Sequence, residues 1–271
     1  MRLLYLFIII DFLLSIIGFN LKNKITYKEV IIKAKLCKVC YSKKPYFNIT
    51  KNKMMNIYDN YIFINETKTK SICFIYYNKE IIDICFKGTS TNSDVCINMD
   101  FLLKDYKNRN ILIHEGFLNN YLSLKSILIT KINYICSKNN IKEICFNGHS
   151  SGGVIANLAS YDLSLLYKDK LIKCITFGSP KIGNKAFIEE YNKRVNISLR
   201  IVNKYDIIQY LPPIPLIYNH NHEAIELDNY KNQYSITKII MNIYDYFKNI
   251  HAISRYIKNL SVYNLNETIN K

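Results

Sequence analysis

The sequence predicts an α/β fold with a mainly parallel central sheet and helices on both of its faces. Short apolar runs rich in isoleucine, cysteine and phenylalanine alternate with longer runs that have helical spacing. Neither an internal repeat nor a linker-like segment separates them. Strands that alternate with helices favour a parallel sheet, because each crossover helix packs back onto a sheet face. With 49% hydrophobic residues the chain can bury a large core, so we expect one α/β domain after the N-terminal segment.

The first half of this domain should contain a helix, a hairpin and a long second helix. Thr26 is followed three residues later by Glu29, which is typical of a capping box and predicts a helix over residues 27–41. Residues 71–77 and 81–87 have the composition of two strands, and the short turn between them predicts a hairpin. Apolar residues at helical spacing predict an amphipathic helix over residues 117–136.

The second half should alternate strictly between strands and helices. The expected strands cover residues 143–147, 173–177, 198–202 and 223–227, and the expected helices cover residues 151–166, about 185–192, and a segment after His251. A proline-rich loop separates the last two strands. This alternation is the main reason for expecting a parallel arrangement.

The N-terminal segment has the features of a secretory signal peptide. Arg2 precedes an apolar run over residues 3–19 that is interrupted by Asp11 and ends near the small residue Gly18. We therefore assign residues 1–18 to a signal peptide and residues 19–271 to the domain, and we expect a secreted protein. The alternative is an uncleaved membrane anchor, although the run is shorter than the roughly 20 residues that a membrane-spanning helix needs.

Cysteines and net charge narrow the possible partners. Cys37 and Cys40 form a lone C-x-x-C, so we expect a local disulfide or two helical thiols and no metal site. Three cysteines lie in apolar runs and are expected to be buried free thiols: Cys85, Cys145 and Cys174. The formal charge of +16 would attract anionic surfaces, but the basic residues are spread along the chain, so no nucleic-acid partner is expected.

A short motif predicts the chemistry. Residues 148–152 read Gly-His-Ser-Ser-Gly, which has the form G-x-S-x-G and stands between an expected strand and an expected helix. In a nucleophile elbow this turn is so tight that the flanking positions, here Gly148 and Gly152, must be small. The following helix would direct backbone N–H groups at a developing oxyanion. Ser150 is therefore the candidate nucleophile.

A serine hydroxyl needs a base and an acid, which in this motif follow in the order Ser, Asp or Glu, His. Asp206 lies just past the end of an expected parallel strand, the edge at which catalytic loops collect, and is the candidate acid. Three histidines follow it: His220, His222 and His251. Spacing alone leaves all three open as the base.

Several ordered blocks resemble the class 3 lipase family of secreted α/β-hydrolases. They read CFKGT at 85–89, HEGF at 114–117, GHSSGG at 148–153, FGSPKIGN at 177–184, RIVNKYDIIQYLPP at 200–213 and HAISRY at 251–256. Together they cover about residues 70–260 and are more specific than an elbow alone. The resemblance implies an α/β-hydrolase fold.

The resemblance also implies roles for individual residues. It assigns Ser150 as nucleophile, Asp206 as acid and His251 as base, and it makes His220 a structural residue. The family's oxyanion donors correspond to Thr89 and to the backbone N–H of Ser151. Ser151 departs from the family, which usually has an apolar residue after the nucleophile.

Further departures from the family concern Lys87 and the segment that follows residue 88. Lys87 stands where the family usually has arginine, and Val95 where an aromatic residue is common. In the family this segment forms a lid that opens at a lipid surface, whereas residues 93–106 are short and mixed here. A lid and a plain surface helix are both open.

The sequence thus predicts a secreted serine carboxylic-ester hydrolase that acts on lipids, most simply a triacylglycerol lipase with a Ser-His-Asp acyl-enzyme mechanism. No cofactor or metal is needed. The expected partner is a lipid ester at a membrane or emulsion surface. The alternatives are a phospholipase A1 or another carboxylesterase, and a non-catalytic lipid-binding member of the fold.

Overall fold

The computed structural model describes residues 25–42, 57–88, 102–107, 110–214, 217–222, 224–227 and 249–261. The expected signal peptide, Thr89 and most of the expected lid segment lie outside these residues. In the parts of the chain that are described, no helix is long and apolar enough to cross a membrane.

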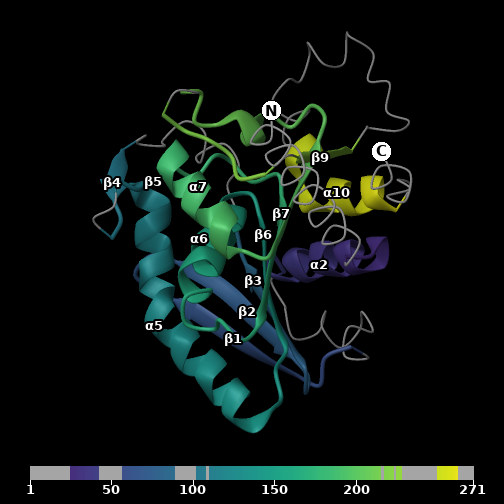
Figure 1. The fold of residues 1–271 in the computed structure, drawn as a ribbon. Helices are drawn as coiled ribbons and strands as arrows, with labels where there is room; N and C mark the ends of the chain where they lie inside the picture. Colours follow the sequence, from purple (N-terminus) through teal and green to yellow (C-terminus); the bar gives the residue numbers. More distant parts are fainter. Residues whose placement is uncertain are drawn as a thin grey trace, which may run out of the picture.

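A seven-stranded sheet forms the centre of the molecule, in the order β1-β2-β3-β6-β7-β8-β9 (Figure 1). Its strands are β1 (Asn60–Glu66), β2 (Ser71–Tyr77), β3 (Ile81–Phe86), β6 (Glu143–His149), β7 (Leu171–Phe177), β8 (Ile197–Asn203) and β9 (Ala224–Leu227). The strands from β3 to β9 are parallel, while β1, β2 and β3 pair antiparallel. The predicted mainly parallel sheet is therefore confirmed. The sequence analysis missed β1 at the antiparallel edge.

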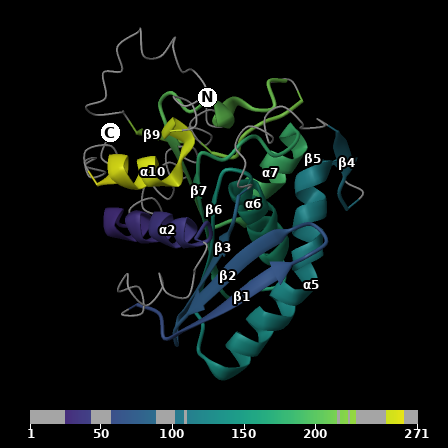
Figure 2. The ribbon, with the colours of Figure 1, turned by 180° about the vertical axis from the view of Figure 1, so that it is seen from behind.

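Helices cover both faces of this sheet, as predicted (Figures 1 and 2). One face carries α5 (Glu115–Lys138), α6 (Ser151–Leu163) and α7 (Lys185–Arg194), and the other carries α2 (Tyr27–Val39) and α10 (Ile253–Leu260). Thr26 caps α2 by accepting a hydrogen bond from the Glu29 N–H at 3.2 Å. Helix α6 ends three residues before the predicted position because the chain turns tightly there, with Leu166 donating to the Leu163 carbonyl.

Small additional elements lie near the carboxyl ends of the parallel strands. A two-stranded sheet pairs β4 (Leu103–Asp105) with β5 (Leu112–His114), and neither strand was predicted. These strands are only three residues long, which leaves too little periodicity to detect. The short 3-10 helix η2 (Ile207–Tyr210) directly follows Asp206.

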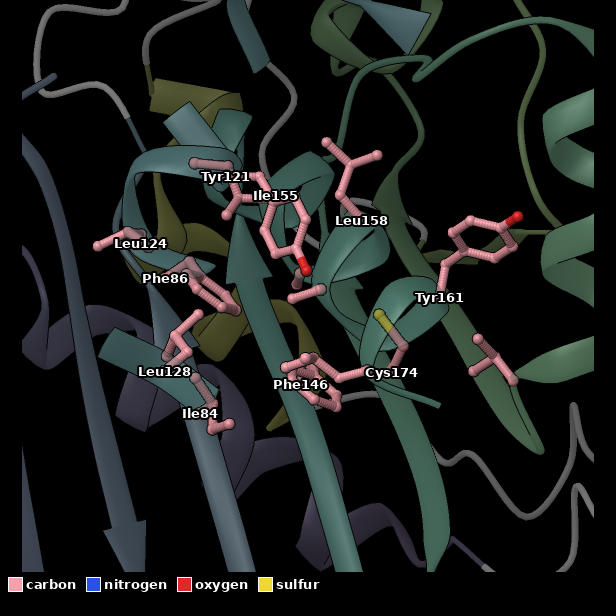
Figure 3. Packing of buried hydrophobic residues seen from close by; sticks show 14 of the residues in the cluster. Ile84, Phe86, Tyr121, Leu124, Leu128, Phe146, Ile155, Leu158, Tyr161 and Cys174 are labelled. Carbon is pink, nitrogen blue, oxygen red and sulfur yellow. The ribbon is translucent and has the colours of Figure 1, made fainter. Parts of the chain in front are cut away.

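The central strands are buried on both faces, which explains their nearly continuous apolar sequences. Side chains alternate between the two sides with a period of two. Phe146 belongs to the cluster under α5 and α6, and its neighbour Cys145 belongs to the cluster under α2. Figure 3 shows side chains of α5 and α6, among them Tyr121 and Ile155, packed over Phe146 and its neighbours.

Helix α2 is joined to the sheet by a buried ion pair. Lys33 Nζ lies 2.8 Å from Asp83 Oδ2 in the middle of β3. Tyr58 and Asn147 donate further hydrogen bonds to the same carboxylate, at 2.5 and 2.9 Å. These contacts hold α2 in a fixed place above β3 and β6.

The cysteines for which the sequence made predictions are free thiols. Cys37 lies within α2 and Cys40 follows its last turn, and both are buried and free, so the local disulfide that was one of two predictions is not formed. Cys85, Cys145 and Cys174 are also buried and free, as predicted.

Candidate active site

Ser150 lies in the turn between β6 and α6 with a strained backbone. Its φ of 59° and ψ of −136° are a combination that a non-glycine residue rarely adopts and that costs about 1–3 kcal/mol. The Ser150 N–H donates to the Phe177 carbonyl at 3.0 Å, and the Ser150 carbonyl accepts from the Gly153 N–H at 2.8 Å. These bonds to β7 and to α6 hold the serine in the strained conformation.

The flanking glycines are required by close backbone contacts. A Cβ on Gly148 would lie 2.1 Å from the Gly152 carbonyl oxygen, and a Cβ on Gly152 would lie 2.4 Å from the Phe86 carbonyl oxygen. Neither contact is sterically possible, so any larger residue would force β6, α6 and β3 apart. The two glycines allow the tight turn at Ser150.

Asp206 follows the carboxyl end of β8 and binds His251. His251 Nδ1 lies 2.7 Å from Asp206 Oδ2, and both side chains are almost completely buried. The Tyr256 hydroxyl donates to the same oxygen at 2.6 Å, while the Ile208 N–H donates to Asp206 Oδ1 at 3.0 Å. The carboxylate therefore fixes both the place and the orientation of the imidazole.

These partners also keep Asp206 ionised. Burial by itself raises the pKa of Asp206, but the neighbouring His251 and the hydrogen bonds from His251, Tyr256 and Ile208 lower it more strongly. The net result is a pKa below the ordinary value of 3.8. An ionised carboxylate in this position stabilises an imidazolium on His251.

The second nitrogen of His251 is unused. Within the described residues, His251 Nε2 is buried and has no hydrogen-bond partner. No hydrogen bond joins it to Ser150 in this part of the chain, although His149, the neighbour of Ser150, contacts His251 directly, with ring centroids 4.7 Å apart. A buried, unsatisfied nitrogen is costly in a purely structural role, and hydrogen bonds at catalytic groups often tighten only when substrate binds.

The other candidate histidines lie elsewhere. His220 Nε2 is 2.5 Å from the Gln209 carbonyl oxygen, and burial, together with the charge of Arg200, lowers the pKa of His220 to about 3. The His222 carbonyl oxygen accepts from Arg200 at 3.0 Å, and its ring packs against Tyr191. Of the three histidines that follow Asp206 in sequence, the structure brings only His251 to its carboxylate.

The two expected oxyanion donors differ in how much can be described. Ser151 is the first residue of α6, so it belongs to the turn whose N–H groups and positive dipole end lie at the elbow. Thr89 lies outside the described residues, but Gly88 before it is close to the serine. A Cβ on Gly88 would lie 3.0 Å from Ser150 Cβ.

Two tyrosines at this edge were not identified from the sequence. Tyr256 belongs to the HAISRY block, so its spacing of five residues from His251 was a usable signal. Tyr41 accepts a hydrogen bond from the Gly88 N–H at 3.0 Å and lies 2.9 Å from His149 Nδ1. No local pattern links Tyr41 to a motif more than 100 residues later.

Comparisons with known proteins match this chain to lipases and to a phospholipase. Residues 84–216 match the family described as Lipase (class 3). A secreted mono- and diacylglycerol lipase of Malassezia globosa is 27% identical over 182 residues, which cover 64% of this chain and 58% of that protein. A chloroplastic phospholipase A(1) of Arabidopsis thaliana is 32% identical over 171 residues, which cover 56% of this chain and 37% of that protein. The chain thus spans little more than half, or less, of these relatives.

Solved structures share the fold. The Rhizomucor miehei lipase in complex with its propeptide matches with a TM-score of 0.66 at 20% identity, over 74% of this chain and 67% of that one. A triacylglycerol lipase whose catalytic centre is formed by a serine protease triad matches with a TM-score of 0.68 at 18% identity, over 84% and 91% of the two chains.

Proposed function

Because this chain belongs to the class 3 lipase family and has the α/β-hydrolase fold, we propose that it is a serine carboxylic-ester hydrolase that acts on lipids. The observation that carries the proposal is the meeting of three groups at one sheet edge. Ser150 has the strained conformation of an elbow, Asp206 orients His251, and His251 keeps one nitrogen unused within the described residues. A purely structural role explains neither the strained backbone of Ser150 nor the unsatisfied nitrogen of His251.

The proposed reaction proceeds through an acyl-enzyme. Ser150 Oγ attacks the ester carbonyl while His251 Nε2 accepts its proton, and the Asp206 carboxylate stabilises the resulting imidazolium. Thr89 and the Ser151 N–H stabilise the oxyanion of the tetrahedral intermediate. His251 then protonates the leaving alcohol as its bond to carbon breaks. Water, deprotonated by His251, attacks the acyl-enzyme and releases the fatty acid and Ser150.

The substrate we propose is a triacylglycerol. The relatives leave a second candidate, since one is named a mono- and diacylglycerol lipase and another a phospholipase A(1). The latter similarity favours phospholipase A1 activity as the alternative. Hydrolysis rates on a triacylglycerol emulsion, on phospholipid vesicles and on a soluble short-chain ester would distinguish the two. If hydrolysis were fast only on the phospholipid vesicles, we would conclude that the substrate is a phospholipid and not a triacylglycerol.

We also propose that the protein is secreted after removal of residues 1–18. The sequence features of this segment support the proposal, and the Malassezia globosa relative is named a secreted enzyme. Mass spectrometry of the N-terminus of protein exported by a eukaryotic host would test it. An intact Met1 on membrane-bound protein would favour the anchor instead.

The decisive test of catalysis is covalent labelling of Ser150. A fluorophosphonate should label the wild type, and Ser150→Ala should abolish both the label and ester hydrolysis, with kcat falling about 10⁶-fold. Ser160→Ala is a matched control, because Ser160 is a buried serine of the same helix α6, and its hydroxyl donates to the Asn157 carbonyl. Its labelling should be unchanged. An unlabelled wild type without esterase activity would favour a non-catalytic lipid-binding protein.

A further inference from the structure

Three hydrogen bonds connect the two sides of the candidate active site through Tyr41 and His149. The Gly88 N–H donates to the Tyr41 hydroxyl at 3.0 Å, and this hydroxyl lies 2.9 Å from His149 Nδ1. The opposite nitrogen, His149 Nε2, lies 2.6 Å from the His251 carbonyl oxygen. The chain of bonds thus begins beside the expected oxyanion donor and ends on the backbone of the candidate base.

The Tyr41 hydroxyl also lies 3.4 Å from the His149 carbonyl oxygen, but its contact with His149 Nδ1 is shorter, at 2.9 Å, and the shorter bonds set the arrangement of protons. The His251 carbonyl can only accept, so His149 Nε2 carries the proton and donates it. Nδ1 then accepts from Tyr41, whose hydroxyl in turn accepts from Gly88. Burial and the charge of His251 lower the pKa of His149 to about 3, and burial raises the pKa of Tyr41, so both rings stay neutral near pH 7. Every polar group in the chain is satisfied.

The His251 carbonyl that His149 binds belongs to the short helical segment just before α10. The preceding carbonyl, that of Ile250, accepts from Asn203 at 2.8 Å. His149 and Asn203 therefore hold two consecutive carbonyls next to the imidazole that must reach Ser150. The bond of His149 is short, and ring contact at 4.7 Å supports it. Loss of this bond would let the His251 backbone shift by a fraction of an ångström.

We propose that Tyr41 and His149 are positioning residues, which together fix the backbone of His251 and of Gly88 relative to Ser150. The inference rests on the proposed function, because it concerns the same reaction. Tyr41 lies outside residues 84–216, so the turn that follows α2 contributes to a site whose serine and acid lie within those residues. The hydrogen bonds of both residues reach backbone groups of the site, at Gly88 and His251, and not the proposed reacting atoms. Both act through the backbone of their neighbours.

Tyr41→Phe tests the link with the loss of a single oxygen. With a soluble short-chain ester, kcat should fall roughly 10-fold while KM changes less than about two-fold, since small displacements of catalytic groups are expensive. Tyr58→Phe is the matched control, because it removes a buried tyrosine hydroxyl under the same helix, bonded to Asp83. This control should lower the melting temperature at least as much as Tyr41→Phe and leave kcat unchanged.

Replacements of His149 separate the two bonds of its ring. A glutamine can place an N–H near the former Nε2, whereas an asparagine can place an acceptor near the former Nδ1. His149→Gln should therefore keep kcat within about three-fold, and His149→Asn should lose roughly 10-fold. His149→Phe, which preserves ring volume and no hydrogen bond, should lose the most. If the substitutions acted only by destabilising the fold, kcat of the three variants would instead fall in the order of their melting temperatures.

The outcomes separate this inference from the proposed function. A wild type that neither hydrolyses esters nor reacts with fluorophosphonate overturns both. An active wild type whose Tyr41→Phe and His149→Phe variants keep kcat within two-fold overturns the positioning role alone. The positioning role is also overturned if kcat decreases together with the melting temperature in every variant, Tyr58→Phe included.

Discussion

Asp206 and Asp83 are both buried carboxylates with a basic partner, yet they differ in what remains unsatisfied around them. Asp83 lies in the middle of β3, and Lys33, Tyr58 and Asn147 together bind both of its oxygens. Asp206 lies at the end of β8, and its partner His251 keeps Nε2 without a hydrogen bond inside the described parts of the chain. Both oxygens of Asp83 are hydrogen-bonded, whereas the partner of Asp206 keeps a ring nitrogen that can accept a proton.

The position of a buried carboxylate in a parallel sheet favours either a structural role or the proposed catalytic one. A carboxylate in mid-strand is surrounded by neighbouring strands and by a helix, so its partners can satisfy it completely. A carboxylate at the carboxyl end of a strand is surrounded by loops, which can bring together groups from distant parts of the sequence. Strain at Ser150 occurs at this same edge, directly after β6.

Removal of the His251 imidazole should have the largest effect on kcat. His251→Ala should lower kcat for a soluble ester by about 10⁶-fold, because the variant lacks the proposed base. His220→Ala is the control, since His220 is a partly buried histidine that binds the Gln209 carbonyl. It should lower the melting temperature and leave kcat within a few-fold. A reversal of the two results would transfer the role of base to His220.

Removing the negative charges should affect the two pairs differently. Asp206→Asn should lower kcat roughly 10⁴-fold, because the amide no longer stabilises the imidazolium of His251. Asp83→Asn should leave kcat for the folded protein unchanged and lower the melting temperature. Steady-state kinetics and thermal unfolding of both variants would test this. Equal losses of kcat would mean that the ion pair of α2 also supports the reaction.

Breaking the pair of Lys33 and Asp83 should cost stability. Lys33→Met leaves Asp83 buried without its cation, which should lower the free energy of unfolding by about 3–5 kcal/mol. The exposed pair of Lys142 and Glu80 provides the matched control, because Lys142→Met should cost less than about 1 kcal/mol. Urea denaturation measures both. A loss below about 1 kcal/mol for Lys33→Met would contradict the structural role of the pair.

The two pairs should lose their stabilising effect at opposite ends of the pH scale. The folded-state pKa of Asp206 is lowered, so its stabilisation is present above about pH 4 and is lost as pH falls through that pKa. Burial lowers the pKa of Lys33, but Asp83 raises it more strongly, to well above 10.5. Its stabilisation is therefore present below about pH 10.5 and is lost as pH rises through the folded pKa.

Melting temperatures across pH would measure both effects. The difference between wild type and Asp206→Asn should narrow in acid, and the difference between wild type and Lys33→Met should narrow in alkali. Because each comparison subtracts the titration of all other groups, it isolates one pair. Differences that stay constant with pH would show that neither group changes its pKa on folding.

Much of the fold could be predicted because it is encoded locally. Residues 143–163 contain a strand, a turn and a helix in direct succession, and short-range periodicity and two glycines suffice to recognise them. Strands β1, β4 and β5 were missed. The short strands β4 and β5 depend on pairing, and β1 depends on the exposed edge of β2, which local sequence does not reveal.

The elbow at Ser150 and the place of Asp206 just past a strand end could be predicted from sequence, because both depend on neighbours within a few residues. Contacts between distant segments bring His251, and not His220, to Asp206. His220 is much nearer in sequence than His251, but the entropy of closing a loop depends so weakly on its length that spacing cannot choose between them. The contacts of Tyr256 and Tyr41 were decided in the same way, by the packing of α10 and α2 against one face of the sheet.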